Sequence, residues 1–214
     1  MTTPATRWRA TCMGAALQAS EEEARAAWSL ADNEPIPFNH RWEHVQQVVK
    51  LAIWLADETG ADPDVVEAAA WLHDVRKTEP DHGERGAETA LSILRETDFP
   101  PAKVDAVVDA IRRHTGMSRT QSSPLQPLEA AVLWDADKLS KIGLQSLVYT
   151  MSSHYLIGKT LSERRRWNQA FVDNVLAETV KSMNTKPATR LAQERYRRNV
   201  EIMDEWRRDE EVTG

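Results

Sequence analysis

Residues 62–77 read DPDVVEAAAWLHDVRK, and this stretch decides the fold class of the chain. Asp62 is a residue type that caps helix N-termini, and Pro63 suits the first helical position. The apolar run that follows ends in an imidazole and a carboxylate, His73 and Asp74. Burying these two groups behind so apolar a helix is costly unless a partner such as a metal ion compensates them. The stretch therefore predicts a buried helix that ends in ligand-type side chains.

The rest of the chain has the pattern of helices joined by short loops. Only eight glycines and ten prolines punctuate the 214 residues, and the prolines fall between segments. Apolar residues recur at helical spacing and alternating patterns are scarce, so we expect an all-α fold. One helix begins at Pro63, another begins at Pro101, and a third begins at Ser20, where three glutamates follow a capping residue. Further helices are expected at 38–59, 84–97, 127–139, 140–156, 162–183 and 187–209.

Composition excludes several classes of protein. Hydrophobic residues make up 41% of the chain and charged residues 28%, and no apolar run reaches the length of a membrane span, which excludes membrane-spanning and disordered proteins. The N-terminus lacks the charged-then-apolar order of a signal peptide, so we expect a cytoplasmic protein. Cys12 is the single cysteine, which excludes an internal disulfide and a thiolate metal cage.

The charge distribution limits the partners. The net charge is −6, divided into −8 over residues 1–158 and +2 over residues 159–214. Proteins that coat a nucleic acid carry a basic surplus, so an extended nucleic acid is not expected as a partner. A small phosphorylated ligand remains compatible, because acidic side chains can hold cations that in turn hold phosphates. No membrane partner is expected, and a homodimer stays open.

Other ligand-type side chains also stand at the ends of apolar segments. His44 shares a helix face with Val48, His114 follows an apolar helix, and Asp135 follows the apolar residues 130–134. His82 stands directly before a glycine. Imidazole and carboxylate ligands without thiolate suit Mn, Fe, Co, Ni, Zn or Mg. The sequence therefore predicts a site for a divalent metal ion.

The order of these residues resembles the HD superfamily of metal-dependent phosphohydrolases. Five motifs carry the resemblance: HRWEH at 40–44, WLHDVRK at 71–77, HGERGA at 82–87, IRRH at 111–114 and DADKL at 135–139. Residues 183–185 and 192–195 resemble the C-terminal helices of small stand-alone members that hydrolyse nucleotides. The resemblance spans residues 36–208 and implies an HD-domain helical bundle with additional N- and C-terminal helices.

The resemblance also implies a division of the chain into three parts. Residues 1–35 form an N-terminal helical segment, residues 36–158 form the HD core, and residues 159–214 form helices that pack on this core in a single compact domain. The chain departs from the family pattern at two positions. Arg41 stands where related sequences often carry aspartate, and Lys138 stands where they often carry arginine. Neither departure removes a metal ligand.

Carried over to this chain, the family pattern implies a ligand set for one or two metal ions. The first ion is expected to bind four residues: His44, His73, Asp74 and Asp135. His82 and His114 either complete a second metal site or face the substrate phosphates. Asp74 is the carboxylate that would bridge two ions.

Catalytic and substrate-binding roles follow from the same pattern. Asp74, Lys77, His82 and His114 are the catalytic candidates, and Lys77, His82, His114 and Lys138 are expected to bind the substrate. Arg85, Arg112 and Arg113 also fall in or beside the motifs and predict, with Lys77 and Lys138, a cationic pocket. His40 shares a helix face with His44, and we expect it to contact the metal-binding residues without binding the metal itself.

The sequence thus predicts a metal-dependent phosphohydrolase that acts on a small phosphorylated metabolite, most plausibly a nucleotide. Three alternatives stay open. One is a mixed-valent di-iron oxygenase, which uses a similar set of six ligands. Another is a cyclic-dinucleotide phosphodiesterase, which is disfavoured because no Gly-Tyr-Pro follows the His-Asp doublet. The last is a non-catalytic helical binding module, which is disfavoured because every ligand-type position is occupied.

Overall fold

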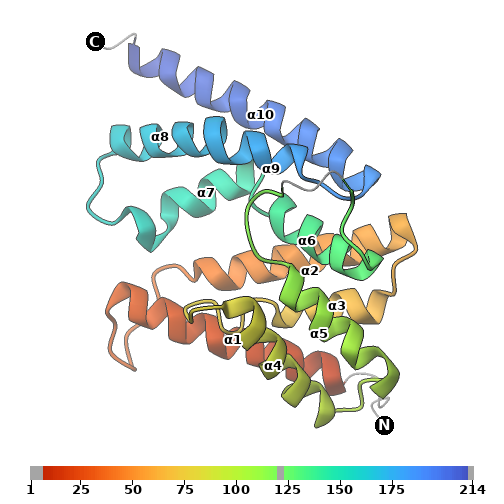
Figure 1. The fold of residues 1–214 in the computed structure, drawn as a ribbon. Helices are drawn as coiled ribbons and strands as arrows, with labels where there is room; N and C mark the ends of the chain where they lie inside the picture. Colours follow the sequence, from red (N-terminus) through yellow and green to blue (C-terminus); the bar gives the residue numbers. More distant parts are fainter. Residues whose placement is uncertain (1–6, 120–122, 212–214) are drawn as a thin grey trace.

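The computed structural model describes residues 7–119 and 123–211, and over these ranges the chain forms helices and no strand (Figure 1). The all-α prediction is therefore confirmed. Two helices cross the middle of the molecule, α2 (His40–Thr59) and α6 (Leu128–Leu139). The remaining helices are α1 (Arg7–Trp28), α3 (Pro63–Leu72), α4 (His82–Arg95), α5 (Val104–Arg113), α7 (Leu144–Ser152), α8 (Leu161–Ala170), α9 (Ala177–Lys181) and α10 (Lys186–Glu211). Short 3₁₀ turns precede α5 and follow α7, at Pro101–Lys103 and His154–Leu156.

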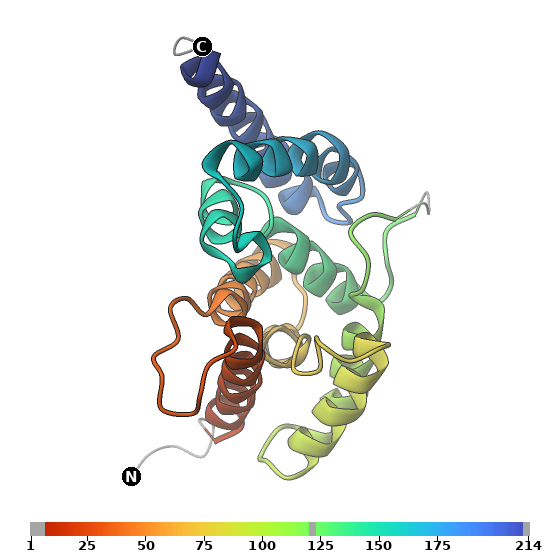
Figure 2. The same cartoon turned by 90° about the vertical axis from the view of Figure 1, so that its left-hand side faces the viewer.

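The central pair of helices separates two groups of elements, as Figure 2 shows. On one side, α1 and α3 pack against α2, and α4 packs against α5. On the other side, α10 packs against α6 and α2 and is joined by α7, α8 and α9. The hydrophobic core is continuous across both groups, from Trp8 in α1 to Met203 in α10. Residues brought together around α2 and α6 are therefore held by packing from both sides.

Helix α3 forms as its sequence predicts. The Asp62 carboxylate accepts hydrogen bonds from the backbone N–H groups of Asp64 and Val65, and Pro63 occupies the first turn. The helix then buries an almost continuous apolar run and ends at Leu72. A turn follows, in which the Lys77 N–H donates to the Asp74 carbonyl. This turn fixes His73 and Asp74 at the centre of the bundle.

Helix α6 is buried on all sides. Every residue from Ala130 to Leu139 is buried, including Asp135, Asp137 and Lys138. The Asp135 carboxylate accepts four hydrogen bonds, from the backbone and side chain of Asn184 and from the backbone and hydroxyl of Thr185. These bonds attach the segment between α9 and α10 to the middle of the core.

Two predicted helix starts are wrong. Helix α1 begins at Arg7, so Ser20 lies inside it, buried, and donates to the Leu17 carbonyl instead of capping a helix. The helix predicted at 140–156 begins only at Leu144, after a turn that includes Gly143, whose φ of +115° lies in a region that favours glycine. The helix predicted at 162–183 forms as one continuous helical run, in which a π-helical segment, Phe171–Leu176, joins α8 to α9.

The expected N- and C-terminal segments extend beyond the described residues, because residues 1–6 and 212–214 lie outside them. The three-part division of the chain stays a prediction. Among the helices of the described ranges, none is both long enough and apolar enough to cross a bilayer.

The close approach of α4 to α5 gives a prediction about stability. A Cβ atom at Gly83 would lie 2.7 Å from Thr115 Cγ2 and 3.2 Å from the Arg112 carbonyl oxygen, whereas a Cβ at Gly14 in α1 would have no neighbour within 4 Å. Gly83→Ala should therefore lower the free energy of unfolding by about 1–3 kcal/mol through overpacking. Gly14→Ala should raise it by about 0.5–1 kcal/mol, because alanine favours helices.

Urea unfolding of the two variants beside the parent protein measures both effects. Equal effects of the two substitutions would contradict the packing described here.

Candidate metal centre

Three buried side chains meet where α2 and the turn after α3 face each other. His44 comes from α2, and His73 and Asp74 come from the turn. The two Nε2 atoms lie 3.4 Å apart, and each lies 3.5 Å from Asp74 Oδ2. Their ligand atoms are close enough together to hold one metal ion.

The outer hydrogen bonds of the two histidines determine which nitrogen carries the proton. His73 Nδ1 lies 2.7 Å from the Ala70 carbonyl, which can only accept, so Nδ1 donates. His44 Nδ1 lies 2.9 Å from Ser140 Oγ, whose hydroxyl donates to the Asp137 carbonyl, so His44 Nδ1 also donates. When both rings are neutral, both Nε2 atoms present lone pairs to each other and to the carboxylate. Burial lowers the pKa of His73 to about 3, which keeps that ring neutral.

Such an arrangement fits a divalent cation. Two imidazole lone pairs and a carboxylate oxygen converge within van der Waals distance, and in that tautomeric state no proton lies between them. A metal ion satisfies all three atoms, and hydrogen bonds from the far side of each ring are the usual way in which proteins orient metal-binding histidines. The donor set suits the borderline and hard divalent ions that the sequence predicts.

A second group lies on the opposite side of the same carboxylate. It consists of Asp74, His82 from the start of α4 and His114 from the end of α5. His114 Nδ1 donates to the Ile111 carbonyl, so Nε2 is its acceptor atom and lies 3.5 Å from Asp74 Oδ1. Both of these atoms are buried without a hydrogen-bond partner among the described residues. Asp74 therefore stands between two sets of histidines.

The structure does not bring Asp135 to this cluster. Its carboxylate is bound by Asn184 and Thr185, as described above, and Asp137 takes its place. Asp137 Oδ1 lies 3.3 Å from His44 Nε2. Residues two positions apart on an α-helix point in directions that differ by about 200° around the helix axis. Only one of the two aspartates, Asp135 or Asp137, can therefore face His44. We therefore replace Asp135 by Asp137 in the expected ligand set.

The sequence held only a weak signal for this choice. Lys141 stands four residues after Asp137, and its ammonium pairs with Asp137. A lysine at this spacing indicates a carboxylate with a charged partner about one turn further along the chain.

Lys138 is also placed differently from the prediction. Its ammonium is buried, donates to the His114 carbonyl at 2.8 Å and pairs with Asp137. It therefore faces the interior of the bundle instead of a substrate. Lys77 is at the cluster, with Nζ 3.2 Å from His82 Nε2 and 3.3 Å from Asp74 Oδ1.

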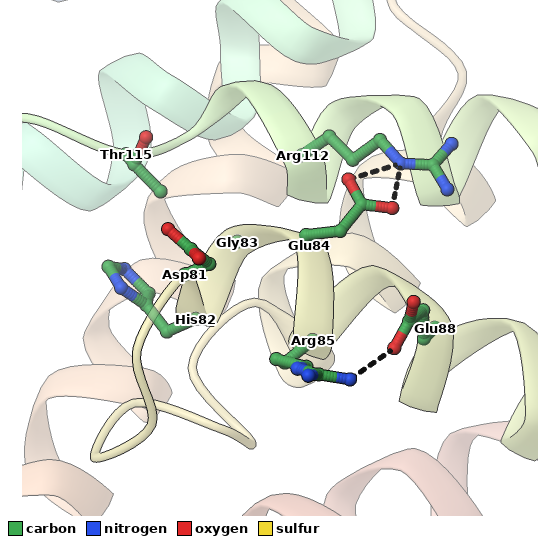
Figure 3. A pocket seen from close by; sticks show the side chains of 8 residues that line it. All are labelled: Asp81, His82, Gly83, Glu84, Arg85, Glu88, Arg112 and Thr115. Atoms are coloured by element: carbon green, nitrogen blue, oxygen red, sulfur yellow. Dashed lines mark hydrogen bonds and ion pairs between the residues drawn. The ribbon is translucent and has the colours of Figure 1, made fainter.

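The three arginines expected in a cationic pocket are bound to carboxylates. Figure 3 shows Arg112 donating to Glu84 and Arg85 donating to Glu88 around an open cavity of about 690 Å³ outside the start of α4. Arg113 donates to Asp109 on its own helix. Because each of these arginines is paired with a carboxylate, the prediction that they form part of a cationic pocket is wrong.

A different cavity of about 230 Å³ adjoins the first group of ligands. The cationic part of its wall is formed by Arg41, Lys77 and Lys141, and His44 also lines it. The aromatic part of the wall consists of Tyr149, Tyr155, Trp167 and Phe171. His40 also lines the cavity, where its ring packs edge-on against Tyr149 and Tyr155. His40 is thus part of the cavity wall.

The charged groups around the cluster are strongly coupled. Arg41 Nη1 donates to Asp74 Oδ2 at 2.6 Å, and its Nε donates to Glu23 of α1 at 2.8 Å. Burial alone would raise the pKa of Asp74, but His73 and Arg41 hold it well below its usual range. Burial lowers the pKa of Lys141 to about 8, although Asp137 opposes the shift. Burial and then Lys77 lower the pKa of His82 to about 4.

The comparison with known proteins agrees with this geometry. Residues 41–142, which contain both groups of ligands, match the family model of the HD domain. Residues 41–142 therefore form an HD domain. No curated protein has a sequence that matches the chain significantly.

Several solved structures share the fold of this HD protein. A predicted HD superfamily hydrolase from an uncultured Thermotogales bacterium is 24% identical over 92% of this chain and 90% of its own, with a TM-score of 0.63. YpgQ of Bacillus subtilis in complex with ADP is 21% identical over 91% and 97%, with a TM-score of 0.62. An HD-superfamily hydrolase of Bacillus thuringiensis is 20% identical over 91% and 97%, with a TM-score of 0.62.

The exchange of Asp135 for Asp137 gives a prediction with a built-in control. Asp137→Asn should weaken Mn²⁺ binding by at least about tenfold, because it removes a charged ligand. Asp135→Asn should leave Mn²⁺ binding unchanged but lower the free energy of unfolding by about 1–3 kcal/mol, because a charged acceptor of four hydrogen bonds is lost.

Titration calorimetry measures the first effect and urea unfolding the second. The assignment would be contradicted if Asp135→Asn, and not Asp137→Asn, lost the metal.

Proposed function

We propose that this HD protein is a metal-dependent phosphohydrolase that acts on a small phosphorylated metabolite, most plausibly a nucleotide. The observation that carries the proposal is the convergence of His44 Nε2, His73 Nε2 and Asp74 Oδ2 beside a cavity that His44 lines together with Arg41, Lys77 and Lys141. The HD domain supports a metal-dependent hydrolase in general. The phosphate chemistry and the nucleotide rest on the arguments that follow.

The metal would be held by His44, His73, Asp74 and Asp137. A divalent ion there would act as a Lewis acid toward a phosphoryl oxygen and would supply hydroxide as the nucleophile at neutral pH. The residues around it provide the remaining functions. Lys77 lies beside Asp74 and is placed to bind a phosphate oxygen through an N–H that it does not use within the cluster. His114 Nε2 is a buried proton acceptor on the far side of the carboxylate.

The charges of the cluster favour an anionic substrate. Three carboxylates, those of Glu23, Asp74 and Asp137, face four cationic side chains, so one positive charge is in excess before any metal binds. The cations are Arg41, Lys77, Lys138 and Lys141. A divalent ion raises the excess to three, and a phosphate group neutralises most of it. Sites of this kind attract phosphorylated ligands.

The aromatic wall of the cavity supports a nucleotide over other phosphates. Trp167 stacks on Phe171 with ring centroids 5.3 Å apart, and Trp167 is 43% exposed. An exposed indole face can stack on a nucleobase, since every base offers a π-face. YpgQ, a relative in fold, was solved with ADP, which agrees with this proposal. The small cavity and the acidic N-terminal part argue against oligonucleotides as substrates. We also propose that the protein acts in the cytoplasm, without a membrane or nucleic-acid partner.

A substrate panel tests the proposal. Nucleoside mono- and triphosphates, phosphosugars, cyclic dinucleotides and oligonucleotides are incubated with Mn²⁺ or Co²⁺, and released phosphate and pyrophosphate are measured. We expect hydrolysis of nucleotides and little of oligonucleotides. His73→Ala should lower turnover more than the roughly 10–100-fold cost of losing a residue that only orients a ligand. No release from any compound, or a preference for oligonucleotides, is incompatible with the proposal.

The aromatic wall predicts a change in specificity. Trp167→Ala should raise KM for nucleotides by about 5–150-fold, which corresponds to the roughly 1–3 kcal/mol of one base-stacking contact. The same variant should hydrolyse a phosphosugar as the parent protein does, which provides the internal control. Equal losses on both substrates would show that Trp167 contributes to the fold of the cavity and not to base recognition.

A further inference from the structure

We infer that Lys77 is the permanent cation of the second ligand group, Asp74, His82 and His114, and that this HD protein therefore binds one divalent ion and not two. The inference rests on the proposed metal site but not on the phosphate reaction. It decides between two roles that the family pattern leaves open for His82 and His114.

The position of the lysine ammonium carries the inference. Lys77 Nζ lies 3.2 Å from His82 Nε2 and 3.3 Å from Asp74 Oδ1. These are two of the three side chains that could hold an ion in the second group. A lysine ammonium has three N–H donors and no acceptor, so His82 Nε2 must accept from it. The ammonium thus occupies the His82 lone pair and pairs with the Asp74 oxygen that a second metal ion would need.

The backbone keeps this cation close to the second group. Lys77 follows Asp74 by three residues, and its N–H donates to the Asp74 carbonyl at 3.1 Å. Its side chain is 31% exposed, whereas that of Asp74 is fully buried. A second metal ion would have to displace a charge that is covalently held within a few ångströms, at a high effective concentration.

In the first group the cationic side chains pair with the carboxylates and not with the imidazoles, since Lys138 and Lys141 contact Asp137. Arg41 contacts Asp74 Oδ2 there, but the lone pairs of His44 Nε2 and His73 Nε2 face each other at 3.4 Å. A metal ion at the first group therefore satisfies two imidazoles that have no other positive partner there. At the second group, one of the two imidazoles is already bound to an ammonium.

The charge of the cluster also opposes a second ion. With one divalent ion the cluster carries three positive charges in excess, and a second divalent ion would raise this to five. Two-metal hydrolase sites hold their ions about 3.5–4 Å apart, so the repulsion acts at short range. Buried charges are screened much less by salt than exposed ones. Replacing the Lys77 charge by an uncharged side chain lowers this repulsion and frees His82 at the same time.

Metal stoichiometry tests the inference directly. The full chain is saturated with Mn²⁺, freed of excess metal by gel filtration, and analysed for manganese per chain and by electron paramagnetic resonance. The parent protein should hold one ion and give the signal of isolated Mn²⁺. Lys77→Met, which keeps the length of the side chain without its charge, should hold two ions and give the signal of a coupled pair. Lys77→Gln is measured beside it, in case one variant folds poorly.

Two further variants serve as controls. Lys141→Met removes a positive charge from the same cluster but leaves Lys77 in place, so it should still hold one ion. Lys77→Met combined with His82→Ala should return from two ions to one.

Two manganese ions in the parent protein, or a single ion in both folded Lys77 variants, would overturn the inference while leaving the proposed function intact. Absence of manganese from the parent protein would overturn the metal site itself, and the proposed function with it.

Discussion

The Asp74 carboxylate is fully buried, and its two oxygens face different histidines. A buried carboxylate without compensation is costly, and breaking such an ion pair by removing one partner typically costs about 3–5 kcal/mol. The bundle compensates Asp74 from several directions. Arg41 reaches it from α2, Lys77 reaches it from the turn after α3, and Glu23 of α1 holds Arg41 in place. The positions of α1, α2 and α3 are therefore linked to one negative charge.

The C-terminal helices position the site from the other side. Asp135 binds Asn184 and Thr185, which connects α6 to the start of α10. In the same orientation of α6, Asp137 faces His44. The two aspartates of α6 thus have different roles, because Asp135 binds the C-terminal segment and Asp137 reaches the histidines. The helices that follow the HD domain have a part in building its site, in addition to the cavity wall that Trp167 and Phe171 provide.

The sequence was sufficient for the fold class because apolar spacing and helix caps are local signals. Asp62 and Pro63 start α3 as predicted. Ser20 was misread because the glutamates after it imitate a capping box, although Trp8, Cys12 and Ala16 already follow a helical spacing into it. The histidines were identifiable because each ends an apolar helix. The sequence did not show whether Asp135 or Asp137 faces the histidines, because α6 is buried on all sides and has no polar face that would indicate its orientation. The orientation becomes visible only in the structure, where Asp135 contacts Asn184, about fifty positions later in the chain.

Anomalous diffraction from crystals grown with Mn²⁺ tests the central claim most directly, since it locates the ion without reference to activity. The account predicts a strong peak bounded by His44, His73, Asp74 and Asp137. A peak at Asp135, or no peak at the buried histidines in a folded and Mn²⁺-saturated protein, would contradict it.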